Sequence, residues 1–273
     1  MITIRQLLTH TSGLPSGIRL SESCFRKQIL QQVAQLTPMH PPGSRFLYSD
    51  VDFIILGHLV EIITQQRFDL YVTSHIFKRL KMAHTFFMPP YSLRDRIAPT
   101  EIIDHALRWG EVHDPTAYRM GGISGNAGLF STAHDLAIYT EMLLNGGHAN
   151  GNYILGPLTI AKMTSVQTPA NLDARGLGWD IDSAYSNRGV LLPVNSFGHT
   201  GWTGTSLWID PSTHSWIIIL TSRTHPSVAS KNQLIQDRRA IANIIGASLT
   251  NVGFYKNTGK GELTRAYSSP AVN

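Results

Sequence analysis

Two short stretches of this sequence carry side chains that could transfer a proton or bind a polar substrate. The first is Tyr48-Ser49-Asp50, and the second is His199-Thr200-Gly201, which follows 151 residues later. A tyrosine hydroxyl ordinarily titrates at about 10, so Tyr48 could act as a base only beside a positive charge. Each tripeptide alone is too common to predict a site. Their order in the chain and the sequences that flank them make the pair informative.

Four longer stretches around these tripeptides resemble one superfamily of enzymes. They are "LLTHTSGLP" (7–15), "FLYSD" (46–50), "GGISGNAGLFSTAHDL" (121–136) and "FGHTGWTGTSLWIDP" (197–211). In order and wording they resemble the serine hydrolases of the penicillin-binding-protein and class C β-lactamase superfamily. The resemblance extends to about Leu249, and "VHDPTAYRMGGISGNAGLFS" (112–131) is closest to the penicillin-binding protein 4B group, whose members are named as D-alanyl-D-alanine carboxypeptidases.

The resemblance implies the catalytic residues. In the superfamily a Ser-x-x-Lys box carries the nucleophile, a Tyr-x-Asn box carries the base or proton relay, and Lys-Thr-Gly or His-Thr-Gly lies on a strand beside the active site. Tyr48, Asp50 and His199 match the second and third boxes. Asp50 stands where the superfamily usually has Asn, and an acid there weakens the case for β-lactam turnover.

The resemblance also implies four substrate-binding residues. Thr200 offers a hydroxyl to a substrate carboxylate, and Gly201 lets the substrate backbone approach the strand. The backbone N–H of Trp202 is the expected donor to the oxyanion of the acyl-transfer intermediate. Arg223, expected near the end of the next long strand, could contribute to binding a terminal carboxylate.

The nucleophile box is absent. No serine in the chain is followed by a lysine three residues later, and the only hydroxyl in that register, Thr159 with Lys162, comes after Tyr48 rather than before it. In the superfamily, Ser-x-x-Lys and two strands of the sheet precede the "LLTHTSGLP" segment. We therefore expect the chain to correspond to the C-terminal three-fifths or so of a longer hydrolase, with the N-terminal strands missing, and to be inactive alone.

Hydrophobic periodicity predicts the elements that must position these residues. Helices are expected over 5–8, ended by Gly13, and over 24–36, 51–66, 68–80 and 231–249. Strands are expected over 196–201, 204–210 and 215–223, the last two joined as a hairpin. The pattern predicts an α+β fold. The resemblance implies one β-lactamase-like domain over 1–249, with a mainly helical region (16–195) and an antiparallel sheet with a terminal helix (196–249), followed by a polar tail (250–273).

Composition narrows the classes of partner. The chain has 273 residues, 42% of them apolar and 15% charged, which is typical of a globular domain. The net charge is +5, but the densest basic cluster, 77–81, is only the solvated end of a predicted helix, so no nucleic acid is expected. The histidines show no ligand spacing and Cys24 is alone, so we expect no metal, no cofactor and no internal disulfide. No export signal and no membrane-spanning run of about 18 apolar residues is visible.

The sequence therefore predicts a penicillin-binding serine acyl-hydrolase that resembles a D-alanyl-D-alanine carboxypeptidase acting on peptidoglycan peptides. Two alternatives stay open: an esterase or weak β-lactamase, which would act on a β-lactam-like small molecule, and a non-catalytic remnant or binding protein. The resemblance places the full-length parent in the periplasm, with possible association with the inner membrane.

Overall fold

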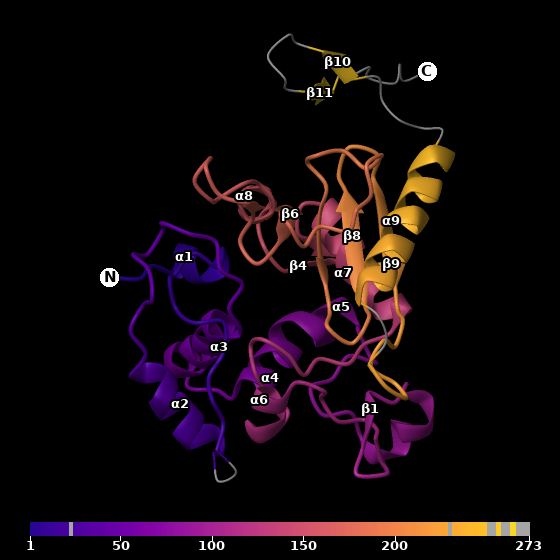
Figure 1. Cartoon of the computed structure of the whole chain (residues 1–273). Coiled ribbons are helices and arrows are strands. Elements are labelled where there is room, and N and C mark those ends of the chain that lie inside the picture. The colour runs from indigo at the N-terminus through magenta and orange to yellow at the C-terminus, as the bar shows by residue number, and fades with distance from the viewer. Residues whose placement is uncertain (22–23, 229–230, 250–254, 258–262, 266–273) are drawn as a thin grey trace.

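The computed structural model describes residues 1–21, 24–228, 231–249, 255–257 and 263–265 (Figure 1). Its α-helices are α1 (Ile4–Leu8), α2 (Arg26–Ala34), α3 (Asp50–Thr64), α4 (Phe68–Val72), α5 (Lys78–Leu80), α6 (Pro115–Arg119), α7 (Ala133–Leu144), α8 (Pro157–Thr164) and α9 (Lys231–Ser248). A π-helical turn (Thr73–Phe77) joins α4 to α5, and a 3₁₀ helix covers Tyr91–Arg96. The long predicted helices are therefore present, with ends that differ by at most two residues. Among the described residues, no helix combines the length and the apolar character needed to cross a membrane.

The main sheet is antiparallel and has five strands in the order β5-β6-β7-β8-β9. Its strands are β5 (Ala174–Arg175), β6 (Asp180–Asp182), β7 (Phe197–Thr200), β8 (Ser206–Asp210) and β9 (Ser215–Ile219). Three strands were predicted. The prediction missed β5 and β6, which lie in the region expected to be mainly helical, because strands of two and three residues are too short to show an alternating pattern. Strand β9 ends at Ile219, so Arg223 lies beyond the strand that was expected to carry it.

Three two-stranded pairs complete the described strands. They are β1 (Glu101–Ile103) with β2 (Ala106–Arg108), β3 (His148–Ala149) with β4 (Asn152–Tyr153), and β10 (Tyr255–Asn257) with β11 (Leu263–Arg265). The last pair falls in the predicted polar tail, and the rest of that tail lies outside the described residues.

The sheet has helices on both faces. Phe197 and Ile209, which pair across β7 and β8, pack with Met142 and Leu143 of α7 in the largest core cluster. Trp208, which precedes Ile209 on β8, faces the other side of the sheet and packs with Ala242 of α9. Figure 1 shows α9 lying along the β8–β9 side of the sheet. The β7 strand can lie this close to Trp208 because Gly198 has no side chain: a Cβ there would lie 2.5 Å from the indole ring.

A second core holds the N-terminal helices together. Leu7 of α1, Ile29 of α2, and Val51 and Ile54 of α3 are buried in it. The α1 helix ends at Leu8 with Thr9 as its C-cap, rather than at Gly13 as predicted. Hydrogen bonds from His10 N to Leu7 O and from Thr11 N to Gln6 O form a Schellman motif.

His10 occupies the left-handed position of this motif, with φ of 55°. Glycine ordinarily fills that position, because a side chain is strained there. The backbone of His10 is therefore strained, and the surroundings of its imidazole belong to the site described next.

Candidate active site

The fold brings the two tripeptides together. Tyr48 lies just before α3 and His199 lies on β7, and their ring centroids are 6.0 Å apart. Ser49 between Tyr48 and the helix is the N-cap of α3: its Oγ accepts a hydrogen bond from Asp52 N and donates one to Pro15 O. The cap fixes the chain direction at Tyr48, so the phenol ring faces the sheet.

The His10 loop closes the site on another side. The His10 ring lies 4.2 Å from the Tyr48 ring, centroid to centroid, and is 1% exposed. Its Nδ1 accepts a hydrogen bond from Ser49 N at 3.1 Å, so the proton of the neutral ring is on Nε2. Burial and the charge of Arg175 lower the pKa of His10 to about 3, which keeps the ring neutral.

A buried carboxyl group fastens this loop to α3. Ser12 Oγ donates to Asp52 Oδ1 at 2.5 Å, and both side chains are buried. Burial raises the pKa of Asp52 to about 7, although the Ser12 hydrogen bond opposes the rise. Asp52 therefore titrates near neutrality, a property that its position in an apolar helix did not reveal in the sequence.

Tyr48 is a poor base in this environment. Burial raises its pKa to about 12, the charge of Asp50 acts in the same direction, and the charge of Arg175 opposes both. The phenol is therefore protonated at neutral pH. It could accept a proton from a nucleophile only if a further positive charge approached its oxygen.

Asp50 is the first residue of α3 and interacts electrostatically with a second carboxylate, that of Asp114. Burial and the charge of Asp114 raise the pKa of Asp50 to about 6, and a hydrogen bond from Asn126 lowers it. Asp114 caps α6 by accepting from Ala117 N, and it also accepts from Asn126 Nδ2 at 3.3 Å. Sequence reasoning missed Asn126 and Asp114, although both lie in the stretch that carried the family resemblance.

The glycine-rich segment reaches the site through a close helix contact. A Cβ on Gly125 would lie 2.0 Å from Phe53 O, and one on Gly57 would lie 3.0 Å from Gly125 N. Only paired glycines allow α3 and this segment to touch, and that contact places Asn126 beside Asp50.

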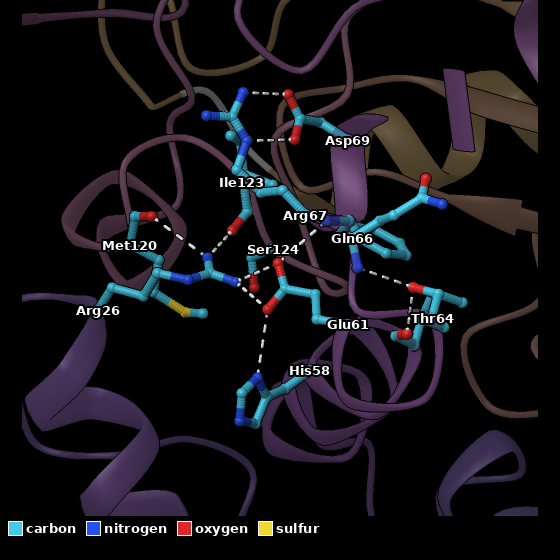
Figure 2. A network of polar contacts seen from close by, with 12 residues as sticks. Arg26, His58, Glu61, Thr64, Gln66, Arg67, Asp69, Met120, Ile123 and Ser124 are labelled. Carbon is cyan, nitrogen blue, oxygen red and sulfur yellow. Dashed lines mark hydrogen bonds and ion pairs between the residues drawn. The ribbon is translucent and has the colours of Figure 1, made fainter. Parts of the chain in front are cut away.

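A polar network fastens the same segment farther along α3 (Figure 2). Arg26 donates to both oxygens of Glu61 and to the backbone oxygen of Ile123. Glu61 also accepts from Phe68 N, and it lies 3.2 Å from His58 Nδ1. The network links α2, α3, α4 and the glycine-rich segment, so it supports the position of Asn126 from a distance.

His199 is neutral and has a defined tautomer. Burial lowers its pKa to about 3, and the charge of Arg175 acts in the same direction. Its Nδ1 lies 3.1 Å from Thr200 O, and because a carbonyl oxygen can only accept, Nδ1 carries the proton. Nε2 is therefore available as an acceptor, and His199 supplies no positive charge to Tyr48 or to a substrate.

The remaining predicted residues follow His199 at the end of β7. Gly201 begins a turn in which its N donates to Thr205 O, and a Cβ there would lie 2.3 Å from Thr205 Oγ1. The turn itself therefore requires glycine, whatever the substrate does. Trp202 is 58% exposed, and the Arg223 guanidinium carbon lies 4.3 Å above its ring centroid while Nε donates to Trp202 O. The roles of these residues and of Thr200 stay predictions.

Three residues of this region were missed by sequence reasoning. The Lys231 ammonium lies 5.7 Å from the Tyr185 ring centroid and 5.9 Å from that of Trp202. Tyr185 in turn lies 5.7 Å from Tyr48. Arg175, buried on β5, acts electrostatically on Tyr48 and His199. None of them has a local sequence signal, because only the tertiary fold brings them to the site.

The hydroxyl in nucleophile register lies elsewhere in the fold. Thr159 and Lys162 are exposed on α8. Within the described residues, no group of three or more His, Cys, Asp or Glu side chains is arranged to hold a metal ion.

Comparison with known proteins gives matches over most of the chain. A family model described as "Beta-lactamase" matches residues 1–240. Curated relatives from Salmonella schwarzengrund (strain CVM19633) and Salmonella newport (strain SL254) are both named "Putative D-alanyl-D-alanine carboxypeptidase". Each is 37% identical over an alignment of 256 residues that covers 84% of this chain. The chain spans 59% of the length of these relatives.

Solved structures show the same fold at low sequence identity. A beta-lactamase from Sulfitobacter sp. EE-36 superposes with a TM-score of 0.67 at 16% identity, covering 90% of this chain and 72% of that one. A beta-lactamase from Mycobacterium bovis gives 0.62 at 23% identity, covering 91% and 74%. A penicillin-binding protein homologue from Caulobacter crescentus gives 0.62 at 17% identity, covering 90% and 71%. The predicted α+β, β-lactamase-like fold is confirmed.

Proposed function

Because the chain belongs to the beta-lactamase family, we propose that the whole protein is a serine acyl-hydrolase that removes the last residue from peptides ending in D-alanyl-D-alanine. A serine oxygen bonds to the carbonyl carbon of the penultimate residue, its proton passes to the leaving nitrogen, and the C–N bond breaks. Water then cleaves the resulting ester. In this proposal Tyr48 and His199 carry the proton, and the nucleophile lies outside residues 1–273.

One observation carries the proposal. The ring centroids of Tyr48 and His199 lie 6.0 Å apart, although His199 follows Tyr48 by 151 residues in the chain. Nε2 of His199 is available as a hydrogen-bond acceptor. Tyr48 is protonated in this chain, so in the proposal a further positive charge beside its oxygen lowers the pKa of the phenol before it accepts the proton, and Nε2 of the neutral His199 accepts a hydrogen bond. The names of the Salmonella relatives support the choice of D-alanyl-D-alanine peptides. The proposal places the whole protein in the periplasm or at the inner membrane, where such peptides occur.

Residues 1–273 alone are proposed to bind such peptides without turnover. The chain has no Ser-x-x-Lys, so no acyl-enzyme can form on that box. A fluorescent penicillin should not label these residues in a way that survives denaturation.

The test compares two chains: residues 1–273, and the longest open reading frame that contains them. The longer chain should release D-alanine from N-acetyl-D-alanyl-D-alanine, and Tyr48→Phe should lower the rate by about a hundredfold or more. Tyr153→Phe, at an exposed position, is the matched control. Faster turnover of a p-nitrophenyl ester or of nitrocefin would instead assign an esterase or a β-lactamase. An inactive longer chain would overturn the hydrolase proposal.

A further inference from the structure

One buried guanidinium in the candidate site has an edge without an acceptor. Arg175 is 1% exposed, and its Nη1 lies 3.7 Å from Asp180 Oδ1, which is longer than a hydrogen bond. In the described part of the chain, no acceptor lies within hydrogen-bonding distance of its Nε or Nη2, and both atoms are buried. Leaving two donor groups of a buried cation unpaired is costly, so an arrangement of this kind calls for an anionic partner.

The geometry of that edge selects one class of anion. The N–H groups on Nε and Nη2 point in the same direction and form the fork that pairs with the two oxygens of a carboxylate. A carboxylate is planar and carries one charge, so it matches both the shape of the fork and the charge of one arginine. Lysine could replace the charge but not the fork.

Arg175 is close enough to the proton-transfer pair to act on it electrostatically. Its charge acts on Tyr48, His199 and His10. Its guanidinium carbon lies 5.7 Å from the ring centroid of Phe46, which makes an edge contact with Tyr185. Burial of the cation away from water strengthens its attraction for an anion.

We propose that the Nε/Nη2 edge of Arg175 binds the terminal carboxylate of the substrate peptide. This inference rests on the proposed function, because it takes the substrate to be a peptide with a free C-terminus. Tyr185 is 44% exposed and makes an edge contact with Phe46, and in this proposal its side chain rotates to admit the carboxylate. Arg223, which the sequence suggested for this role, instead donates from Nε to Trp202 O and stacks on that indole ring.

The experiment titrates residues 1–273 with N-acetyl-D-alanyl-D-alanine and, in parallel, with the same dipeptide as its C-terminal amide. The Nε–Hε resonance of Arg175 is followed by ¹H–¹⁵N NMR. We expect the acid to shift this resonance and the amide to leave it unchanged. Arg175→Lys should weaken binding of the acid by about tenfold or more, because it keeps the charge and loses the fork. Arg188→Lys is the matched control, since Arg188 is already paired with Asp182 at 3.0 Å.

Three results would overturn the inference: equal binding of acid and amide, no shift of the Arg175 resonance when the acid binds, or loss of binding in Arg223→Lys but not in Arg175→Lys. The resonance shift is measured on the unsubstituted chain, so the test holds even if a variant fails to fold. None of these readouts requires turnover. Binding of the acid through Arg175, together with an inactive longer chain, would support this inference and refute the hydrolase.

Discussion

The imidazole of His10 lies against the phenol ring of Tyr48, with their centroids 4.2 Å apart, and accepts a hydrogen bond from the residue that follows Tyr48. The end of α1 and the start of α3 are joined at this point. The position of Tyr48 therefore depends on a residue in a strained backbone conformation, 38 residues earlier in the chain.

His10→Ala should destabilise the fold by about 2–4 kcal/mol. The substitution leaves Ser49 N–H without its acceptor and opens a cavity beside Tyr48. Denaturant unfolding measures the change. His134→Ala, at an exposed position in the first turn of α7, should change stability by less than about 0.5 kcal/mol. Equal effects of the two substitutions would show that the His10 contacts contribute nothing.

Asp52→Asn should flatten the dependence of stability on pH. The folded chain keeps the Asp52 proton up to a pKa of about 7, whereas the unfolded chain loses it near the ordinary value of 3.8. Between these values the folded state binds more protons, so this group makes stability fall as pH rises from about 4 to about 7, by at most about 4 kcal/mol. The amide that the substitution introduces cannot titrate and still offers Ser12 an acceptor.

The measurement is the free energy of unfolding at several pH values across this window. Asp104→Asn, at an exposed turn, serves as the control and should leave the slope as it is in the unsubstituted chain. An unchanged slope in Asp52→Asn would mean that Asp52 is ionised throughout the window.

Arg26→Met should cost about 1–3 kcal/mol of stability, because it leaves Glu61 without its cation and Ile123 O without its donor. Figure 2 also shows the control, Arg67, which pairs with Asp69 through two hydrogen bonds but is 58% exposed. Arg67→Met should cost less than about 1 kcal/mol, since water competes for an exposed ion pair. Thermal unfolding of both variants checks the order, and a larger effect at Arg67 would contradict it.

Gly57→Ala should separate α3 from the glycine-rich segment. The new Cβ would lie 3.0 Å from Gly125 N, and the backbone there must move to admit it, at a cost of about 1–3 kcal/mol. We expect the amide resonances of Asn126 and Asp50 to shift in NMR spectra. Gly17→Ala, with nothing within 4 Å of its Cβ, should be neutral or slightly stabilising. Unchanged resonances at Asn126 would rule out the coupling.

The sequence by itself determined the long elements and the motifs. The periodic apolar residues of 51–66 and 231–249 predict helices that the structure contains as α3 and α9. A long helix or strand repeats its pattern enough times to be recognised, because the same face is buried at every turn or every second residue. Tyr48 and His199 were identified through wording that resembles a family, and the fold of that family is the one observed.

Only the tertiary structure decided what surrounds the two motifs. Strands β5 and β6 are too short to carry a pattern, and yet β5 carries Arg175, whose charge acts on Tyr48. Gly13 was predicted to end the first helix, whereas the left-handed residue that follows α1 is His10. The raised pKa of Tyr48 and the lowered pKa of His199 arise from burial and from the charges around them. Burial and charge depend on contacts between residues far apart in the chain, and no local pattern records those contacts.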